Sequence, residues 1–232
     1  MCGRIHIKDN SFVQLLLEEL FVENPQAQLY SNFVKPCDTV SIITQDQGSR
    51  TIKPAMWWLL LDEKEQGFKP SRFTSFNTRF DKLAQPGSAG FIPFKSSRCI
   101  IPATGFGETQ TSKGNASVYH DLVAVERAIA FAGLYRSWQH SKTGEVVHSC
   151  SIITNAPHIK LAQIHTKASP ATLLPSEYES WLDCKQTKPQ ALTEVLKPRI
   201  AQNFHVQQIN KPSLQQAIGA PFTIQSDLVG NS

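Results

Sequence analysis

The stretch VYHDLVAVERAIAFAGL, residues 118–134, decides the fold class of this chain. It holds two apolar runs of strand length, Val118–Val123 and Ala128–Leu134, with only a short turn between them. A connection this short leaves no room for the crossover helix that joins parallel strands. The stretch therefore predicts antiparallel sheet.

The same order of strands and short polar turns continues on both sides of this stretch. Further strand-like runs are found at Thr39–Thr44, Ile52–Leu61, Cys99–Pro102, Val146–Thr154 and Phe204–Ile209. An amphipathic helix is expected at Ser11–Leu20, capped by Asn10 or Ser11, and shorter helices at His158–Ile164, Ser176–Leu182 and Gln190–Leu196. We expect an α+β fold of mainly antiparallel β-sheets, closing in a barrel-like manner, with peripheral helices. A Rossmann sheet is disfavoured, because GxGxxG and regular βαβ alternation are missing.

The length and composition are those of one folded domain. No long linker divides the 232 residues, so we expect residues 1–232 to form a single domain. Hydrophobic residues make up 41% and charged residues 18%, which is typical of a globular protein rather than a disordered one. The net charge of +4 and the pI near 8.8 are a mild bias toward anionic partners and do not by themselves indicate nucleic-acid binding.

The cysteines indicate whether a metal or disulfides are expected, and the apolar runs indicate whether a membrane span or signal peptide is expected. Five cysteines are present and none forms a CxxC pair, which disfavours a zinc site and a disulfide framework. We therefore expect no metal, no cofactor and a reducing compartment. No apolar run approaches the ~20 residues of a membrane span, and charged residues interrupt the region where a signal peptide would be apolar. The expected location is cytoplasmic, and nucleoid-associated in a bacterium, without membrane contact.

The first four residues, Met1-Cys2-Gly3-Arg4, carry the most specific chemistry of the chain. Removal of Met1 before a small side chain would leave Cys2 with a free α-amine beside its thiol. The amine titrates at about pH 7.7–8.0 and the thiol at about 8.5, so both are partly nucleophilic near neutral pH. Such an aminothiol attacks an aldehyde through nitrogen and then sulfur, closing a thiazolidine ring. Gly3 permits a tight turn, and Arg4 supplies a permanent cation suited to phosphate.

Three further segments combine reactive side chains with turn chemistry. In the first, Asn77 is suited to hydrogen-bond a ligand and Arg79 to hold a phosphate. In the second, a strand ends at Pro102 and a glycine-rich turn presents Glu108, whose partial desolvation would raise its pKa for general acid–base work. In the third, His165 ends a short helix and titrates near neutral pH. Each of these residues alone is as consistent with a solvated turn or a capping role.

Taken together, these segments resemble one family. The chain has MCGR at Met1–Arg4, Asn-x-Arg at Asn77–Arg79, RCIIPAxGFxE at Arg98–Glu108 and HxKAxP at His165–Pro170. This set, in this order over residues 1 to about 175, is similar to the SOS-response-associated peptidase (SRAP) family. SRAP proteins bind abasic sites in single-stranded DNA and crosslink to them, so the resemblance implies that partner.

The resemblance also implies a role for each matched residue. Cys2 is the nucleophile that forms the thiazolidine with the opened deoxyribose aldehyde, and Asn77 hydrogen-bonds near the crosslink. Glu108 handles protons during ring opening and Schiff-base formation, while His165 assists and protonates the departing sugar oxygen. Capture by the thiol removes the imine that would cut the strand by β-elimination, so the abasic site is shielded. Phosphates would be held by Arg4, Arg79 and Lys167.

Several positions depart from the family pattern. Thr109 stands where tryptophan is common, Ser169 replaces a methionine, and Trp58 and Asp81 also differ. These departures concern the DNA wedge and base-stacking surface more than the reactive centre. The remaining candidates for stacking are Trp57, Trp58 and Phe106.

Two other classes of function are consistent with parts of the sequence. Glutamine amidohydrolases with an N-terminal nucleophile also begin Met-Cys-Gly, but the segment Arg98–Glu108 is not part of their pattern. A single-stranded DNA-binding module without covalent chemistry would be indifferent to the loss of Cys2. The family name implies a hydrolase, protease or lyase, and we expect proteolysis to concern residues before Cys2. A monomer is expected.

Overall fold

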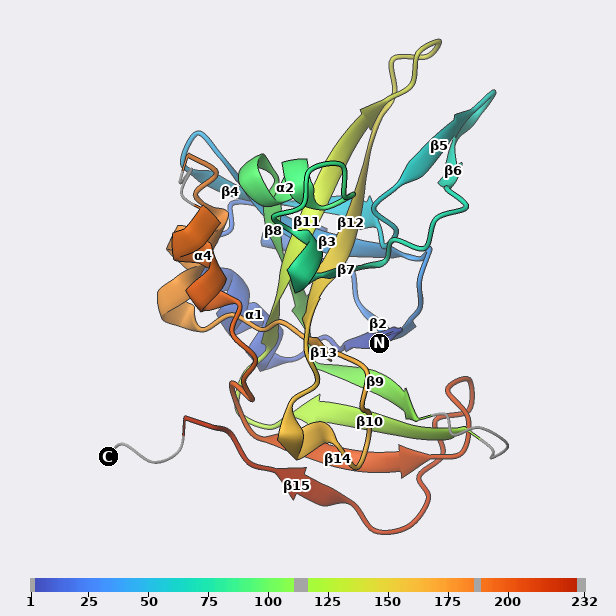
Figure 1. Cartoon of the computed structure of the whole chain (residues 1–232), viewed down its shortest axis with the longest axis vertical. Coiled ribbons are helices and arrows are strands. Elements are labelled where there is room, and N and C mark those ends of the chain that lie inside the picture. The colour runs from blue at the N-terminus through green and yellow to red at the C-terminus, as the bar shows by residue number, and fades with distance from the viewer. Residues whose placement is uncertain (1–2, 111–116, 186–188, 229–232) are drawn as a thin grey trace.

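The computed structural model describes residues 3–110, 117–185 and 189–228. It has two stacked parts, a barrel and an open sheet below it, with helices on the outside (Figure 1). The barrel strands pair in the order β11 (Ile129–Gln139), β8 (Arg98–Ala103), β3 (Thr39–Asp46), β4 (Ser49–Met56) and β12 (Val146–Asn155). Because β12 also pairs with β11, the ring closes. The expected α+β fold with mainly antiparallel, barrel-like sheets is confirmed.

Short strands extend the barrel along β12. β7 (Asn77–Arg79) pairs with β12 in parallel, and β13 (Ser169–Pro170) pairs with it antiparallel. The hairpin of β5 (Leu61–Lys64) and β6 (Gly67–Pro70) projects from the upper end of the barrel (Figure 1). The strand β12 thereby brings the segments around Asn77 and Ser169 to one edge of the barrel.

The open sheet is antiparallel throughout. Its strand order is β15 (Phe222–Ile224), β14 (Phe204–Ile209), β10 (Val118–Ala124), β9 (Gly105–Gln110), β1 (Arg4–Ile7) and β2 (Ser31–Val34). The two runs of the stretch 118–134 therefore enter different parts of the fold, since β10 lies in the open sheet and β11 in the barrel. The short turn between them is the point where the chain passes from one sheet to the other.

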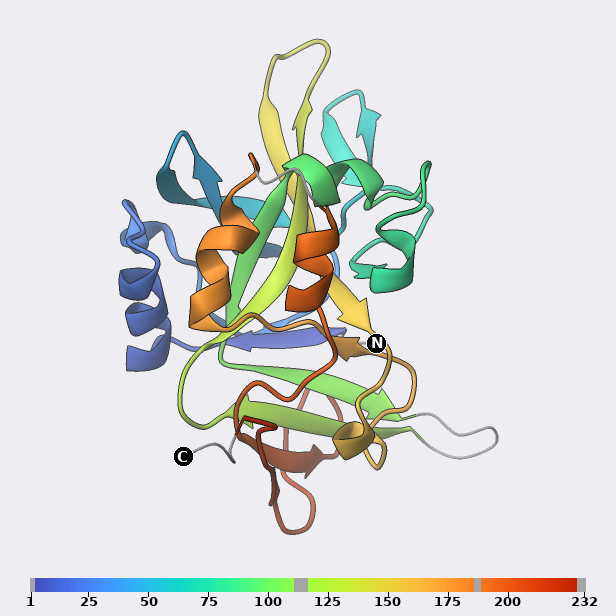
Figure 2. The same cartoon turned by 60° about the vertical axis from the view of Figure 1, so that its left-hand side comes forward.

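Four α-helices of the described residues cover the barrel. They are α1 (Ser11–Glu19), α2 (Phe91–Ser96), α3 (Tyr178–Leu182) and α4 (Pro189–Val195), joined by 3₁₀ turns at Pro25–Ala27, Phe80–Lys82, Ile159–Leu161 and Pro175–Glu177. Figure 2 shows α1, α3 and α4 against the outer face of the barrel. The cap predicted for α1 is confirmed, because Asn10 Oδ1 accepts a hydrogen bond of 3.1 Å from Val13 N.

Three predicted elements were wrong in their bounds or type. The strand expected at Ile52–Leu61 ends at Met56, where buried Trp57 donates from Nε1 to the Phe76 carbonyl at 2.9 Å and the chain leaves the sheet. The helix expected at His158–Ile164 is only the 3₁₀ turn Ile159–Leu161. The glycine-rich turn before Glu108 is instead strand β9, which pairs with β1 and β10.

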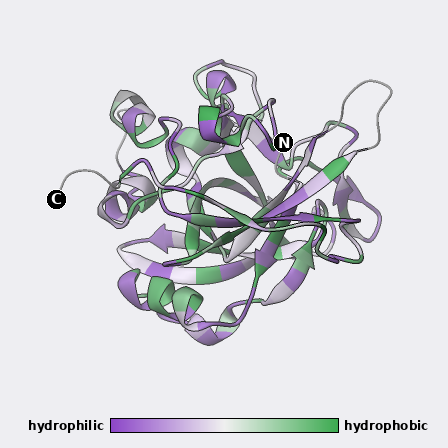
Figure 3. Ribbon diagram, turned by 90° about the horizontal axis from the view of Figure 1, so that it is seen from below, coloured by the Kyte–Doolittle hydropathy of each residue, from purple (hydrophilic) through white to green (hydrophobic). Residues whose placement is uncertain are grey.

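Two apolar clusters pack the inside and the outside of the barrel wall. Ile42, Ile101 and Phe131 belong to an inner cluster that continues onto the open sheet, where the Phe106 ring lies 5.9 Å from that of Phe131. Their chain neighbours, such as Ile43 and Ile100, belong to an outer cluster under the helices. This two-sided burial follows from the alternation of side chains along a strand. The hydropathy-coloured ribbon, seen from below, shows hydrophilic and hydrophobic residues mixed along the strands (Figure 3).

Candidate functional site

Glu108 lies in the middle strand of the group β1–β9–β10, where the open sheet meets the barrel. It is two residues after Phe106 and so shares the inward face of β9. Its side chain is almost fully buried, with 1% of the residue exposed. Burial raises the pKa of Glu108 to about 7, although the cation of Arg4 opposes this shift. The carboxyl group therefore exchanges its proton near neutral pH.

His165 lies against this carboxyl group. It follows the 3₁₀ turn Ile159–Leu161, and its backbone N donates to the Leu161 carbonyl at 2.8 Å. Its Nδ1 is 3.1 Å from the Thr109 carbonyl oxygen and 3.5 Å from Glu108 Oε2. A carbonyl oxygen only accepts, so Nδ1 carries the proton and Nε2 of the neutral ring is the basic nitrogen. Burial lowers the pKa of His165, with a smaller effect of Lys167 in the same direction, although the hydrogen bond to the Thr109 carbonyl opposes the shift; the neutral ring is therefore favoured.

Asn77 is positioned by the parallel pairing of β7 with β12, where it lies opposite Ile152. The next residue, Thr78, points into the barrel wall and its Oγ1 lies 2.7 Å from Ser151 Oγ. Because side chains alternate along a strand, Asn77 and Arg79 point to the other side of β7. Asn77 is half-buried and Arg79 is exposed.

Arg79 and Lys167 line one pocket of about 450 Å³. Its wall also contains Thr154 and Asn155, which are 2% and 6% exposed. Within the described part of the chain, Thr154 Oγ1 and Asn155 Oδ1 have no hydrogen-bond partner. Buried polar atoms without partners are costly unless a ligand or water satisfies them. Asp81 also lines the pocket and Asn155 Oδ1 only accepts, so the features that suit an anion here are the two cations and the Thr154 hydroxyl group.

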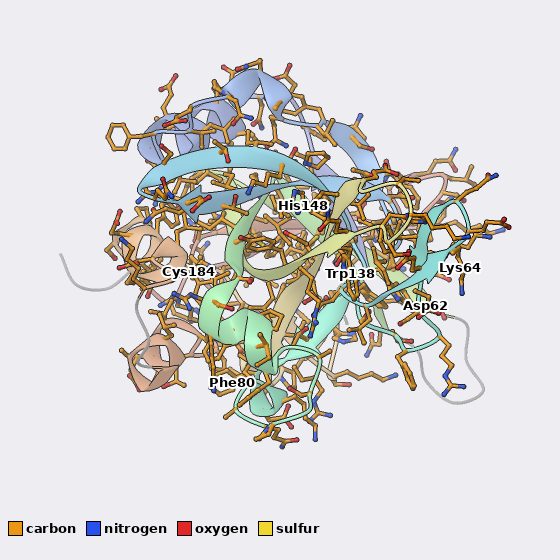
Figure 4. All side chains as sticks on the ribbon, turned by 90° about the horizontal axis from the view of Figure 1, so that it is seen from above. Asp62, Lys64, Phe80, Trp138, His148 and Cys184 are labelled. Carbon is orange, nitrogen blue, oxygen red and sulfur yellow. The ribbon has the colours of Figure 1, made fainter. Side chains whose placement is uncertain are left out.

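The two cations of this pocket, Arg79 and Lys167, are exposed side chains. Arg79 donates to Asp81 from Nε at 2.9 Å and from Nη2 at 2.7 Å, but both side chains are more than half exposed. Such surface pairs contribute little energy. Phe80, which follows Arg79 and also lines the pocket, lies at the rim of the molecule in the view from above (Figure 4).

Arg4 is in a different environment from the one expected. It is 4% exposed, and its Nη2 and Nε lie 2.5 Å and 3.0 Å from Asp121 Oδ1. Nη2 also donates to the His120 carbonyl at 3.2 Å. A phosphate contact by Arg4 would have to compete with this buried carboxylate, so the structure favours an internal role. Arg4 thus lies apart from the pocket of Arg79 and Lys167.

The remaining sequence-based expectations have mixed outcomes. Cys2 lies outside the described residues, so its approach to Glu108 stays a prediction. Trp57 and Phe106 are 0% and 2% exposed and pack in the core, which removes them as stacking surfaces. Trp58 is half-buried and its ring lies 5.8 Å from that of Phe76. The substituted Ser169 accepts a hydrogen bond of 3.1 Å from His158 N, which fixes the loop that leads to His165.

Sequence reasoning assigned no role to three residues of this region, although Thr154 and Asn155 belong to the segment that leads to His165. Asp121 is the buried partner of Arg4, and Thr154 and Asn155 line the cationic pocket. Asp121 did leave a signal, because aspartate is depleted in strands and this one interrupts the apolar run Val118–Val123. Thr154 and Asn155 end an apolar strand and have no such signature.

Two general properties of the described residues complete the site. No group of three or more His, Cys, Asp or Glu side chains in this part of the chain is arranged to hold a metal ion. None of the helices within residues 3–110, 117–185 and 189–228 has the length and apolarity needed to cross a bilayer.

The buried carboxyl–imidazole pair is suited to proton transfer, and the pocket that contains Lys167, two residues after His165, holds two exposed cations. The family model described as SOS response associated peptidase (SRAP) matches residues 1–213. This chain belongs to the SRAP family.

Curated relatives and solved structures agree with this assignment. The abasic site processing protein YoqW of Bacillus subtilis (strain 168) is 26% identical over 233 residues, covering 97% of this chain and 100% of YoqW. The abasic site processing protein HMCES of Pongo abelii is 26% identical over 188 residues, covering 69% of this chain and 53% of HMCES. A protein from Bacteroides thetaiotaomicron superposes with a TM-score of 0.70 at 20% identity, covering 92% of this chain and 95% of its own. A phage-related protein from Bordetella bronchiseptica gives 0.66 at 19% identity, with coverages of 90% and 95%. The two structures show the fold alone.

Proposed function

We propose that this chain captures abasic sites in single-stranded DNA through a covalent bond to processed Cys2. Membership of the SRAP family and the names of the curated relatives support abasic sites as the substrate. The observation that carries the proposal is the buried pair of Glu108 and His165, 3.5 Å apart. An abasic sugar rests as a closed hemiacetal, and opening it requires proton transfers of the kind this pair provides.

The proposed reaction needs no oxidant, reductant or cofactor. Ring opening moves the proton of the anomeric hydroxyl group to the ring oxygen and frees the C1′ aldehyde. The α-amine of Cys2 adds to the aldehyde carbon, and loss of one water gives an imine. The Cys2 sulfur then bonds to the imine carbon while the thiol proton passes to nitrogen, closing the thiazolidine. The net change is one crosslink and one water, and the strand stays intact.

The geometry supports separate roles for the two proton carriers. Glu108, with a pKa of about 7, is present at neutral pH in both forms and is suited to take a proton from one oxygen and return it to another. His165 is held through Nδ1–H by the Thr109 carbonyl, which leaves Nε2 to exchange a proton with the departing sugar oxygen. Asn77 would orient the reacting end of the chain by hydrogen bonding.

The cationic pocket would hold the DNA backbone. Arg79 and Lys167 supply charge, and Thr154 supplies a hydroxyl group that a phosphate oxygen would satisfy. Arg4 forms a buried ion pair with Asp121, so we assign the phosphate contacts to Arg79 and Lys167. The chain would act as one domain, as a monomer inside the cell near the nucleoid, and any proteolysis would be limited to residues before Cys2.

A denaturing gel tests the proposal directly. The chain with processed Cys2 is incubated with a single-stranded oligonucleotide that contains one abasic site, and with the undamaged oligonucleotide as control. We expect a slow-migrating covalent band with the abasic strand only. Cys2→Ala and an extra N-terminal residue before Cys2 should abolish the band, and Glu108→Gln should slow its formation by about 10²–10⁴-fold.

The other outcomes identify the competing functions. Binding of undamaged strands without any covalent band would indicate a non-covalent single-stranded DNA-binding module. Release of ammonia from glutamine, dependent on Cys2, would indicate an N-terminal-nucleophile amidohydrolase. A covalent band that persists in the tagged chain would exclude the α-amine as nucleophile.

A further inference from the structure

Three residues from adjacent strands form a single row across the open sheet. Arg4 on β1 lies opposite Gly107 on β9, and Gly107 lies opposite Asp121 on β10. The middle strand has no side chain at this point, so the guanidinium group of Arg4 crosses β9 and reaches the Asp121 carboxylate at 2.5 Å. A Cβ atom on Gly107 would lie only 2.1 Å from Arg4 Cζ. Glycine is therefore required here by a close approach, not by a turn.

Asp121 also contacts the second outward-facing residue of β1. His6 Nε2 lies 3.2 Å from Asp121 Oδ1, while His6 Nδ1 lies 2.6 Å from the Asn32 carbonyl oxygen on β2. His6 crosses β9 above Gly105, where a Cβ atom would be 3.4 Å from its ring. Although burial alone would raise it, His6 and Arg4 together lower the pKa of Asp121, so its carboxylate is charged. One carboxylate thus holds two side chains of β1.

Burying the charged groups of Arg4 and Asp121 costs desolvation energy. A contribution to stability is therefore a poor explanation for this arrangement. Buried ion pairs are often no more stabilising than apolar side chains of similar volume, and their best-attested use is to fix a unique register. The pairing of β1 with β9 covers only Arg4–His6, and β1 is irregularly paired with β2 between Ile5 and Ile7. Backbone pairing of β1 with β9 is therefore short, and side-chain contacts to Asp121 add to what fixes its register.

We propose that Asp121 is a positioning residue, which fixes the start of β1 against β9 and thereby holds the N-terminal nucleophile in register with Glu108. The inference rests on the proposed function, since it concerns the same reaction. Two sequence distances support it: Cys2 is two residues before Arg4, and Glu108 directly follows Gly107. The anchor on β10 therefore acts on β9, which carries Glu108, and on β1, which begins two residues after Cys2.

The test compares Asp121→Asn with Asp62→Asn. Asp62 is exposed on the β5–β6 hairpin and lies at the rim of the molecule in Figure 4, which makes it a matched control. The crosslinking rate constant is measured in a single turnover at saturating abasic single-stranded DNA. The dissociation constant for undamaged DNA and the unfolding temperature are measured in parallel. Misplacement of a reacting group by about 1 Å costs on the order of 100-fold in rate, so Asp121→Asn should slow the step by about 10–100-fold.

A merely structural role predicts a different pattern. Loss of folded protein would lower the amplitude of the crosslinking reaction but leave the rate constant of the folded fraction unchanged. A positioning role lowers the rate constant and leaves the dissociation constant for undamaged DNA within about twofold of the wild type. The double variant Arg4→Ala/Asp121→Ala should be no slower than the slower single variant, because both remove one contact.

Hydrogen exchange supplies a readout that does not depend on the reaction. In Asp121→Asn, the amides of Ile5 and Ile7 should exchange faster, while those of the barrel strand β11 stay protected. A rate constant equal to the wild type would overturn the proposal, even if β1 exchanged faster. If the wild-type chain forms no crosslink at all, the proposed function fails and the catalytic part of this inference falls with it. Faster exchange in β1 would then still show that Asp121 anchors the strand.

Discussion

The two buried arginines of this protein are held in opposite ways. Arg98, on the barrel strand β8, is fully buried and donates to neutral main-chain carbonyls of Phe94 at 2.9 Å, Lys95 at 3.1 Å and Trp181 at 2.6 Å. These carbonyls lie in the last turns of α2 and α3, where helices lack internal donors. Arg4, on the open sheet, is instead paired with the carboxylate of Asp121.

This difference separates a structural region from a reactive one. In the barrel, a cation with a constant charge attaches two helices to the wall. In the open sheet, five buried ionisable side chains lie on three adjacent strands, and their charges interact; they are Arg4, His6, Glu108, His120 and Asp121. Proton chemistry near neutral pH requires such groups, and stability is reduced where they are gathered.

The largest expected effect is in the barrel. Arg98→Met leaves several buried helix carbonyls without a donor, and each such group costs ~1–3 kcal/mol. We expect a loss of roughly 4 kcal/mol in the free energy of unfolding, measured by urea denaturation. Crosslinking per folded molecule should not change. Exposed Arg127→Met serves as the control, and a similar loss in both variants would contradict the contrast between the two arginines.

The second prediction concerns Glu108 and pH. Its pKa is about 7 in the folded protein against 4.5 ordinarily, so the unfolded chain ionises first as pH rises. Stability is then lost between about pH 4.5 and 7 and stays low above this range, by ~3 kcal/mol at most. Glu108→Gln cannot ionise at this position and should be more stable than the wild type at pH 8. This difference in the free energy of unfolding between variant and wild type, the stability gap, should close near pH 4.

Thermal unfolding across this pH range measures the gap. Exposed Glu65→Gln should show no comparable pH-dependent difference. A gap for Glu108→Gln that is the same at pH 4 and pH 8 would mean that the carboxyl group is not desolvated as the geometry indicates.

The third prediction sharpens the account of Gly107. The added methyl group of Gly107→Ala displaces the Arg4 guanidinium group, and overpacking of this kind costs about 1–3 kcal/mol. Denaturant unfolding of Gly107→Ala, Arg4→Ala and the double variant forms a cycle. The double variant should be less destabilised than the sum of the singles, because the clash disappears with Arg4. Strict additivity would count against the crossing of β9 by Arg4.

The smallest effect is expected in the cationic pocket. Arg79→Ala and Lys167→Ala should each reduce the salt dependence of binding to undamaged single strands, by about 0.7 in the log–log slope. Stability should hardly change, since both side chains are exposed. Lys142→Ala, on the turn between β11 and β12, is the control. If the slope is unchanged in the pocket variants, the DNA backbone does not bind in this pocket.

Much of the fold could be predicted from apolar patterning. Helix α1 with its Asn10 cap and most barrel strands follow from local sequence. Strand β9 was misread, because Gly105 and Gly107 indicate a turn when seen in the sequence alone. At Gly105 the reason is the close approach of the Leu122 carbonyl oxygen on β10. At Gly107 it is the passage of Arg4 across the strand, a contact with a residue about a hundred positions away. Contacts this far apart in the chain cannot be inferred from the pattern of apolar and polar residues.

The candidate site shows the same limit. Motif order pointed to Glu108 and His165, and the structure places them 3.5 Å apart, yet their roles stay predictions. Their proximity depends on a hydrogen bond from His165 to the Thr109 carbonyl, 56 residues away. Asp121 was read as part of an ordinary strand, because its partners lie 117 and 115 positions earlier.

The pairing of β1 with β9, a strand formed much later in the chain, has a consequence for biosynthesis. Its partner β9 ends at Gln110, and β10, which supplies Asp121 to Arg4 and His6, ends at Ala124, so a ribosome must add more than a hundred residues before β1 can dock against β9. At about 5–20 residues per second, this delay lasts roughly 5 to 25 seconds. The removal of Met1 that the proposed function requires would fall within this interval, before β1 docks against β9.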